Sequence, residues 1–360
     1  MNRYAPLPFV SGVLRRHPAV VSAAAAATGF IRRMSLKQHR SSVRRRELSL
    51  AAACHSFHAS RCHIFREKGH GSVPTIVISG FVPDATEVAE FQRDLLKSFG
   101  NIYYVNFPRN GFSTELFCAQ LADLIEEVNN RGEEPVLFSI SFGCGLTARF
   151  LKDNRHENLR IRGLVMISPV LCKEDLVRPD GDRKGGVRIL ESNLRRILKA
   201  DVHQADDVAR QMDRARRCFQ SLFEAGAENR VLTSRHLSIR GKIMDVLEKT
   251  SNLGGYERVL ALKDFPLPDR SEPIFSGPAL TLLAETEENM LVPTSPTLSA
   301  LRERETSGEL FPCGTVRTVV SHRADDAVAH ASLIFHHRFF NPLLEAWYVD
   351  MKQPKMRSVV

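Results

Sequence analysis

A short apolar run that leads directly into a serine flanked by small residues limits the fold of this 360-residue chain more than any other feature. Residues 135–140, Pro-Val-Leu-Phe-Ser-Ile, have the pattern of a buried strand, and Ser141 follows with Ser139 and Gly143 two residues to either side. A serine on a sharp strand-to-helix turn has a strained backbone, and only small side chains fit at those flanking positions. The helix expected from Gly145 onward would direct its free N–H groups and its positive dipole end toward the serine. We therefore interpret Ser141 as a candidate nucleophile.

The segments around this motif alternate between strand-like and helix-like patterns. Apolar runs with the composition of buried strands occupy residues 75–81, 101–107, 161–167, 278–284 and 315–320. Residues 87–99 and 116–128 carry apolar side chains at helical spacing. This order is typical of a mostly parallel, twisted sheet with helices on both faces and right-handed crossovers. An α/β fold class is therefore predicted, with residues 62–66 as an early edge strand.

Two loops that follow the first strands carry further motifs. Ser79-Gly80-Phe81 ends the first run, and residues 106–113, Asn-Phe-Pro-Arg-Asn-Gly-Phe-Ser, end the second. With these loops and the serine motif, the chain resembles the α/β-hydrolase fold superfamily, serine hydrolase type. The resemblance extends over about residues 73–350. The superfamily has histidine in place of Ser79 and aspartate in place of Asn106. The resemblance implies a nucleophile elbow at Ser141.

The same resemblance implies an oxyanion hole and a cap. The backbone N–H groups of Phe81 and Phe142 would form the oxyanion hole. Residues 171–277 are charged and helical, without strands between the helices, and the superfamily carries a helical cap at this place in the chain. The expected division of the chain is a basic, disordered leader over 1–50, an α/β-hydrolase domain over 54–350 and a tail over 351–360.

The acid of the expected catalytic triad belongs after the strand at 278–284, because the chain order in this fold is serine, acid, histidine. Residues 285–293 resemble the Gly-x-x-Asp-x-x-Val-Pro loop of the superfamily with a change of length. Counting forward from Ala284 reaches Glu287, whereas counting back from Val292-Pro293 reaches Asn289, which cannot provide an anion. We therefore prefer Glu288, which lies between the two counts, and keep Glu287 as the alternative acid.

The histidine is expected after the strand at 315–320, where two candidates lie. His322 follows the strand immediately, and His330 follows a loop. We prefer His330, because a position in the first turn of a helix would fix the orientation of a general base, and His322 is the alternative base. Asp325 or Asp326 would cap that helix. Either aspartate is also an alternative acid.

Positive charge is concentrated at the start of the chain. The sequence has 50 Lys and Arg against 41 Asp and Glu, a formal charge of +9. Residues 1–46 hold ten of the basic residues and no acidic one, so the remainder has 40 basic and 41 acidic residues, a charge of −1. This balance argues against a nucleic-acid-binding groove and limits expected membrane contact to the leader. The leader has the composition of an organelle-targeting segment.

Seven cysteines without a Cys-x-x-Cys pair argue against a disulfide framework or zinc site. We therefore expect a cytoplasmic location, with organelle targeting through the leader as the alternative.

The leading hypothesis is a serine hydrolase that cleaves an ester or thioester of an apolar acyl group through an acyl-enzyme intermediate, without a metal or organic cofactor. An acyltransferase on the same fold and a non-catalytic binding protein are the alternatives. The substrate and the oligomeric state stay open.

Overall fold

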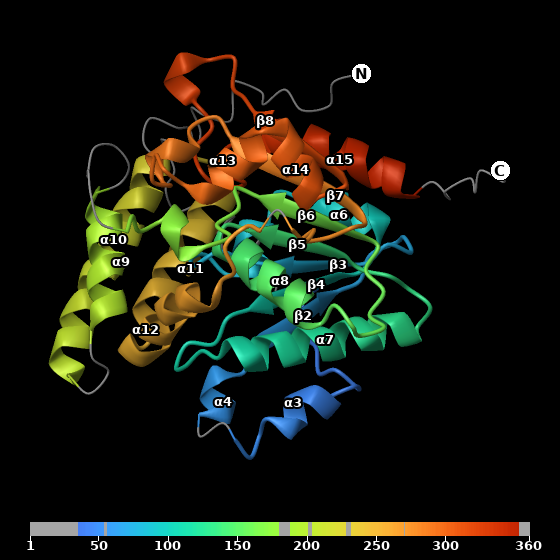
Figure 1. Ribbon diagram of the computed structural model, residues 1–360, viewed down its shortest axis with the longest axis horizontal. Helices are drawn as coiled ribbons and strands as arrows, with labels where there is room; N and C mark the ends of the chain where they lie inside the picture. Colours follow the sequence, from blue (N-terminus) through green and yellow to red (C-terminus); the bar gives the residue numbers. More distant parts are fainter. Residues whose placement is uncertain are drawn as a thin grey trace.

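A mostly parallel β-sheet forms the centre of the protein (Figure 1). The computed structural model describes residues 35–53, 56–179, 188–200, 204–227, 232–269 and 271–352. The described residues form an eight-stranded sheet in the order β1-β2-β4-β3-β5-β6-β7-β8. β1 and β2 pair antiparallel with their neighbours, and the strands from β4 to β8 run parallel. The predicted α/β fold class is confirmed.

The strands coincide closely with the apolar runs of the sequence. Their bounds are β1 Lys37–Gln38, β2 His63–Glu67, β3 Thr75–Ile78, β4 Ile102–Asn106, β5 Val136–Ile140, β6 Gly163–Ile167, β7 Pro278–Ala284 and β8 Cys313–Val319. β3 to β6 are buried along their whole length, because helices cover both faces of a parallel sheet. The strand expected at the edge, β2, instead lies between β1 and β4.

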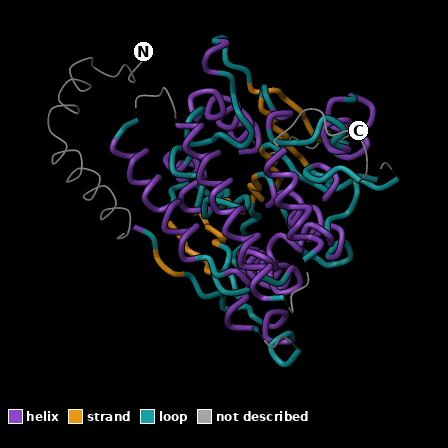
Figure 2. Tube along the Cα trace, turned by 90° about the vertical axis from the view of Figure 1, so that its left-hand side faces the viewer, coloured by secondary structure: helices purple, strands orange, loops and turns teal. Residues whose placement is uncertain are grey.

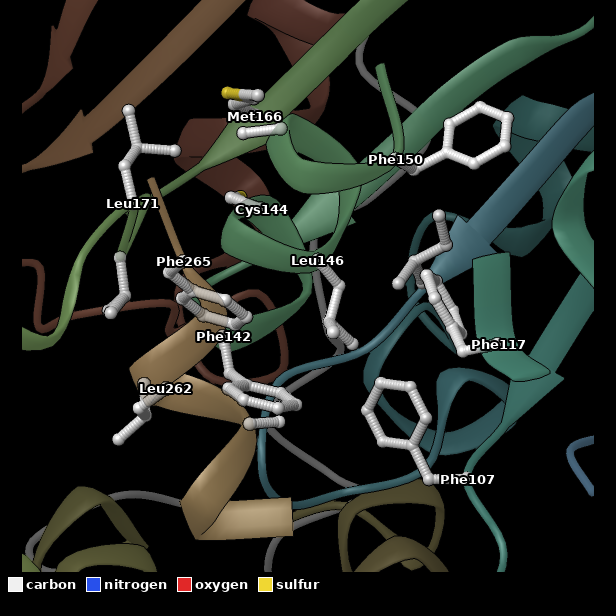
Figure 3. Close-up of a cluster of buried hydrophobic side chains, with 14 of the residues drawn as sticks. Phe107, Phe117, Phe142, Cys144, Leu146, Phe150, Met166, Leu171, Leu262 and Phe265 are labelled. Carbon is white, nitrogen blue, oxygen red and sulfur yellow. The ribbon is translucent and has the colours of Figure 1, made fainter. Parts of the chain in front are cut away.

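Helices surround the strands of this sheet (Figure 2). Two hydrophobic clusters fill its two sides. On one side, α7 (Thr114–Asn130) and α8 (Phe142–Asp153) pack their apolar side chains against the strands. On the other side, α6 (Arg93–Phe99) and α15 (His337–Lys352) do the same. Alternate strand residues join opposite clusters: Leu137 belongs to the first and Phe138 to the second. Figure 3 shows part of the first cluster around α8.

Local sequence signals explain several helix boundaries. The Ser113 hydroxyl accepts the N–H of Leu116 at 3.1 Å and caps α7, as expected for a serine before a helix. The helix expected over 87–99 is divided into α5 (Ala85–Val88) and α6. The break contains the buried Gln92, whose amide donates to the Leu333 carbonyl and to Asn341. These tertiary bonds are invisible in the helical spacing of the sequence.

Residues 35–50 belong to the folded domain, so the expectation of a disordered leader is wrong for this part. β1 pairs with β2, and α3 (Arg45–Ser49) packs against α7. The Arg46 guanidinium lies 3.1 Å from the buried Asp123 carboxylate, which also accepts the N–H of Glu47. The acidic side chains of α7 therefore hold this basic segment, a pairing that composition alone does not reveal. The leader before residue 35 and the tail after 352 lie outside the described residues.

A helical insertion separates β6 from β7. It comprises α9 (Arg188–Lys199), α10 (Ala205–Ala227), α11 (Ser234–Lys249) and α12 (Asn252–Leu260), which lie together at the left of Figure 1. The smaller elements are α4 (Phe57–Ser60), α13 (Pro296–Arg302), α14 (Arg304–Leu310), η1 (Lys173–Asp175), η2 (Ala261–Asp264), η3 (Glu287–Asn289) and η4 (Ala324–Asp326). Across the described ranges, we find no helix with both the length and the apolar character needed to cross a bilayer.

Candidate active site

Ser141 occupies a strained turn between β5 and α8. Its backbone has φ 50° and ψ −118°, a combination that a residue with a side chain rarely adopts. The Ser141 N–H donates to the Ile167 carbonyl at 2.9 Å, which holds the turn against the end of β6. The predicted strand, turn and helix are therefore present around this serine.

The residues on either side of Ser141 are small because other chain segments come very close. A Cβ atom added to Gly143 would lie 2.4 Å from the Ser79 carbonyl oxygen, well inside a van der Waals contact. Ser139 is fully buried, and its hydroxyl lies 2.6 Å from that of Thr147 in α8. The Thr147 hydroxyl in turn donates to the Gly143 carbonyl at 2.8 Å. These contacts explain why the motif has a serine and a glycine at the flanking positions.

The structure brings His330 and Glu287 to Ser141. The Ser141 hydroxyl donates to Nε2 of His330 at 2.9 Å, and Nδ1 of His330 lies 2.5 Å from Oε2 of Glu287. A carboxylate only accepts hydrogen bonds, so Nδ1 carries the proton and Nε2 accepts. The other Glu287 oxygen accepts the Ala284 N–H at 2.6 Å. Glu287 is fully buried, and the His330 side chain is 7% exposed, so the contact between these two residues is shielded from water.

The preference for Glu288 over Glu287 is therefore corrected. η3 is a tight turn that directs Glu287 inward, whereas Glu288 lies at the surface against Arg302. Neighbouring residues of such a turn point in different directions, and motif counting cannot assign those directions. The other two alternative acids, Asp325 and Asp326, form ion pairs elsewhere. Asp325 pairs with Arg323, and Asp326 pairs with Arg338.

His330 reaches Ser141 from a loop and not from a helix as expected. α15 begins only at His337, and the alternative base His322 is exposed directly after β8. The loop is fixed beside His330 by Ala331, whose φ is 51° and whose N–H donates to the Ser168 hydroxyl at 2.8 Å. Ser168 was not singled out in the sequence, although its position at the end of β6 beside the elbow strand was the available signal.

Phe142 and the loop that carries Phe81 both lie beside the turn of Ser141. Phe142 is the first residue of α8, where a backbone N–H has no acceptor within its own helix. Gly80, which precedes Phe81, is so close that an added Cβ would lie 3.3 Å from the Ser141 Cβ. Both expected oxyanion residues therefore flank the serine.

Their side chains have different surroundings. The Phe142 ring is fully buried in the core beside Phe265, as Figure 3 shows, with ring centroids 5.2 Å apart. The Phe81 ring stacks on Phe142 with a centroid separation of 4.2 Å and contributes to the cavity wall. The Phe81 ring therefore contacts the core through Phe142 and also lines the cavity.

A cavity of about 440 Å³ opens onto Ser141 and His330. The helical insertion and the strand-end loops both contribute apolar side chains to it. The apolar lining from the insertion includes Leu190 and Leu194 of α9, Phe219, Leu222, Phe223 and Ala225 of α10, and Ile243 of α11. The apolar lining from the loops includes Phe81, Val82, Pro83, Met290, Ile334 and Phe335. Among the described lining residues, no Asp, Glu, Lys or Arg is present, which suits an uncharged apolar group.

Cys144 lies three residues after Ser141 but belongs to the core. Its side chain is fully buried, and burial raises the pKa of its thiol well above the usual value. The reactive form of cysteine is the thiolate, which this environment disfavours. Cys144 is therefore a packing residue.

Comparisons with solved structures identify the fold. A thermophilic esterase from Thermogutta terrifontis matches 81% of this chain and 95% of its own, with a TM-score of 0.55 and 15% identity. An esterase from Exiguobacterium antarcticum matches 80% of this chain and 96% of its own, with a TM-score of 0.54 and 13% identity. The chain has the α/β-hydrolase fold.

A third solved structure with the α/β-hydrolase fold matches nearly the whole chain. It is a membrane phospholipase A described as a bacterial virulence factor, and it covers 96% of this chain and 97% of its own, with a TM-score of 0.56 and 13% identity. No protein-family model matches the sequence, and no curated protein does. The residues that meet at the site follow the order usual in this fold: Ser141 after β5, Glu287 after β7 and His330 after β8.

Proposed function

We propose that the protein is a serine hydrolase that cleaves an ester or thioester of an apolar acyl group through an acyl-enzyme intermediate. The observation that carries this proposal is the continuous hydrogen-bonded chain Ser141, His330, Glu287 at the wall of an apolar cavity. Esterases and a phospholipase A among the similar structures support a hydrolase. Fold alone does not determine chemistry, so the proposal depends on the site.

Acylation begins when Ser141 attacks the carbonyl carbon of the substrate. His330 Nε2 accepts the hydroxyl proton, while Glu287 holds Nδ1–H and stabilises the imidazolium that forms. The carbonyl oxygen becomes an oxyanion between the N–H groups of Phe142 and Phe81. Preorganised donors of this kind each lower the barrier by about 3–4 kcal/mol.

Three proton transfers complete the turnover. His330 first gives its proton to the departing alkoxide or thiolate, and the acyl group stays on Ser141 as an ester. Water then enters, gives a proton to His330 and attacks the acyl carbon, and the free acid leaves as Ser141 recovers its proton. The cycle balances without an oxidant or reductant, and the residues named carry out each step.

The cavity determines which acyl groups fit. Burial of each methylene contributes about 0.8 kcal/mol, so a chain that fills the apolar wall binds more tightly than acetate. Helices α9, α10 and α11 form much of this wall, and we assign them the role of a cap over Ser141. The partner is therefore a small acyl ester or thioester.

Buried cysteines without disulfides among the described residues are compatible with a cytoplasmic location.

A fluorophosphonate probe tests the proposal, because it labels only an activated serine. We expect labelling of the wild type and of Ser332→Ala, which removes a serine from the same cavity wall, but not of Ser141→Ala. Hydrolysis of p-nitrophenyl esters should follow the same pattern. Equal labelling of Ser141→Ala and wild type would refute the assignment of Ser141, and no labelling of the wild type would refute the proposal and favour a binding protein.

A further inference from the structure

Arg258 of α12 is buried behind the loop that carries Phe81. Its side chain donates from Nη1 to the Phe81 carbonyl at 3.0 Å and from Nη2 to the Pro108 carbonyl at 2.7 Å. The guanidinium also lies over the Phe107 ring, 5.2 Å from the ring centroid. Arg258 is 4% exposed, so these contacts replace its hydration. One side chain of the insertion therefore bridges the loops that follow β3 and β4.

The positive charge of Arg258 has no carboxylate bonded to it in the described structure. The nearby Asp84 carboxylate pairs with Arg109. Burial, and to a lesser extent the neighbouring Arg109, lowers the pKa of Arg258 to about 10. The side chain therefore keeps its charge at neutral pH. Its Nε atom is buried without a hydrogen-bond partner among the described atoms.

An apolar residue of similar length would be the less costly choice for simple packing at this position. Burying a charge without a paired anion costs several kcal/mol, and hydrophobic replacements of buried charges are often neutral or stabilising. The fork geometry of arginine has a specific use here, because it reaches two carbonyl groups from different loops at once. This points to a function for the charge or for the fixed donors.

The contact reaches the proposed oxyanion site through one residue. Phe81 accepts from Arg258 with its carbonyl, and its N–H is the second oxyanion donor that the proposed function requires beside Ser141. Gly80 precedes it, and glycine leaves the backbone free to rotate, so the N–H direction needs an external anchor. α12 supplies that anchor from a firmly held position: its Ser251 hydroxyl donates to the Arg109 carbonyl at 3.1 Å, and Glu257 accepts the Phe112 N–H at 2.7 Å.

We propose that Arg258 is a positioning residue of the oxyanion hole, which orients the Phe81 N–H through the Phe81 carbonyl and adds positive potential behind the developing negative oxygen. This inference rests on the proposed serine hydrolase function. It also assigns the insertion a second role, because α12 then supports the chemistry while α9, α10 and α11 line the cavity.

Arg258→Met and Arg258→Lys test the inference, with Arg216→Met as the matched control. Arg216 of α10 also donates to a backbone carbonyl, that of Thr250, and to Asn252 in α12, but it does not contact either loop. For Arg258→Met we expect kcat to fall about 10-fold to 100-fold, a fraction of the loss from deleting a donor, with KM changed little. Arg258→Lys should recover part of kcat, because it keeps the charge without the fork.

The affinity for a trifluoromethyl ketone with an apolar chain is a second measurement, which a purely structural role of Arg258 would leave unchanged. It adds to Ser141 and forms an oxyanion, so its affinity should weaken by the same factor as kcat. Substrate KM and the affinity of a non-reactive apolar alcohol should stay the same. All rates are expressed per fluorophosphonate-reactive site.

The inference is overturned if Arg258→Met loses no more kcat than Arg216→Met, or if ketone affinity stays at the wild-type value. If Arg258→Met does not fold, Arg258→Lys decides, and wild-type kcat and ketone affinity in that variant would overturn the inference. Failure of the proposed function has a different signature, namely wild-type turnover in Ser141→Ala. If Ser141→Ala is inactive and the Arg258 variants match the control, only the inference about Arg258 is wrong.

Discussion

Ser141 shows how neighbouring atoms impose a local conformation. Its φ of 50° is unfavourable for a serine, and the surrounding contacts must hold it there. The close approach of β3 to Gly143 and the bond between the Ser141 N–H and the Ile167 carbonyl supply those contacts. The sequence predicted this serine because the pattern that indicates the turn, an apolar run followed by Ser139, Ser141 and Gly143, lies within nine consecutive residues.

Replacing Glu287 or Glu288 by glutamine, one at a time, tests which of the two glutamates contributes to catalysis. Glu287→Gln should lower kcat about 10³-fold to 10⁴-fold, because the amide no longer stabilises the imidazolium and can favour the wrong His330 tautomer. Glu288→Gln should keep wild-type activity, since Glu288 contacts Arg302 at the surface. Steady-state kinetics with p-nitrophenyl butyrate checks both. Loss of activity in Glu288→Gln alone would restore the original preference between the two acids.

A methyl group at Gly143 should damage the turn. The added Cβ would clash with the Ser79 and Ile78 carbonyl oxygens, which cannot move without breaking β3. Gly143→Ala should therefore lose about 1–3 kcal/mol of unfolding free energy, as in an overpacked core, and most of its activity. Gly241→Ala is the control, because its Cβ meets nothing within 4 Å and alanine favours the helix by up to about 1 kcal/mol. Urea unfolding measures both, and equal stabilities would contradict this account.

At the scale of elements, strands were easier to predict than the connections between them. Buried strands appear as continuous apolar runs, and β7 matches its expected bounds at 278–284. The turn η3 and the loop before α15 have no such pattern, because their conformations depend on long-range bonds such as that between Ala331 and Ser168. The residues expected as acid and base could therefore be assigned from the sequence only to within a few residues.

The packing of α10 against the cavity predicts a chain-length effect. An added Cβ at Gly226 would lie 3.1 Å from the ring of Phe335, and both residues line the cavity. Gly226→Leu should therefore lower kcat/KM for octanoate and longer esters at least about tenfold more than for acetate, the loss of roughly two buried methylenes. The measurement is a series of p-nitrophenyl esters from acetate to dodecanoate.

Gly241→Leu in α11 is the control for that series, because its side chain has open space around it. It should leave the chain-length profile unchanged. A parallel shift of all esters in Gly226→Leu, without a dependence on chain length, would show that the acyl group does not occupy this cavity.

At the scale of the whole molecule, composition gave a wrong prediction for residues 35–50, which are folded and not a disordered leader. Ten basic residues without an acidic one suggested a leader, yet residues 35–50 complete the sheet and pack on α7. Arginine-rich segments fold when carboxylates elsewhere in the chain neutralise them, and Asp123, Glu126 and Glu127 are spread among the apolar residues of α7. Global charge balance could be read from the sequence, whereas this pairing could not.

Two truncations test the extent of the domain. Removal of residues 1–34 keeps every described contact and provides the reference Tm. Removal of residues 1–50 also deletes Arg46 and leaves the buried Asp123 unpaired, a change that costs about 3–5 kcal/mol for a broken buried pair. Thermal unfolding followed by circular dichroism compares them. Equal Tm values would mean that the segment 35–50 contributes nothing to stability.

The central claim is that Ser141 carries the acyl group during turnover, and intact-protein mass spectrometry after rapid mixing with a p-nitrophenyl ester tests it most directly. We predict a burst of p-nitrophenol equal to the enzyme concentration and a mass increase of one acyl group, located on the peptide that contains Ser141. Ser141→Ala should give neither signal. Turnover of the wild type without any covalent adduct, or an adduct and burst that persist in Ser141→Ala, would contradict the account.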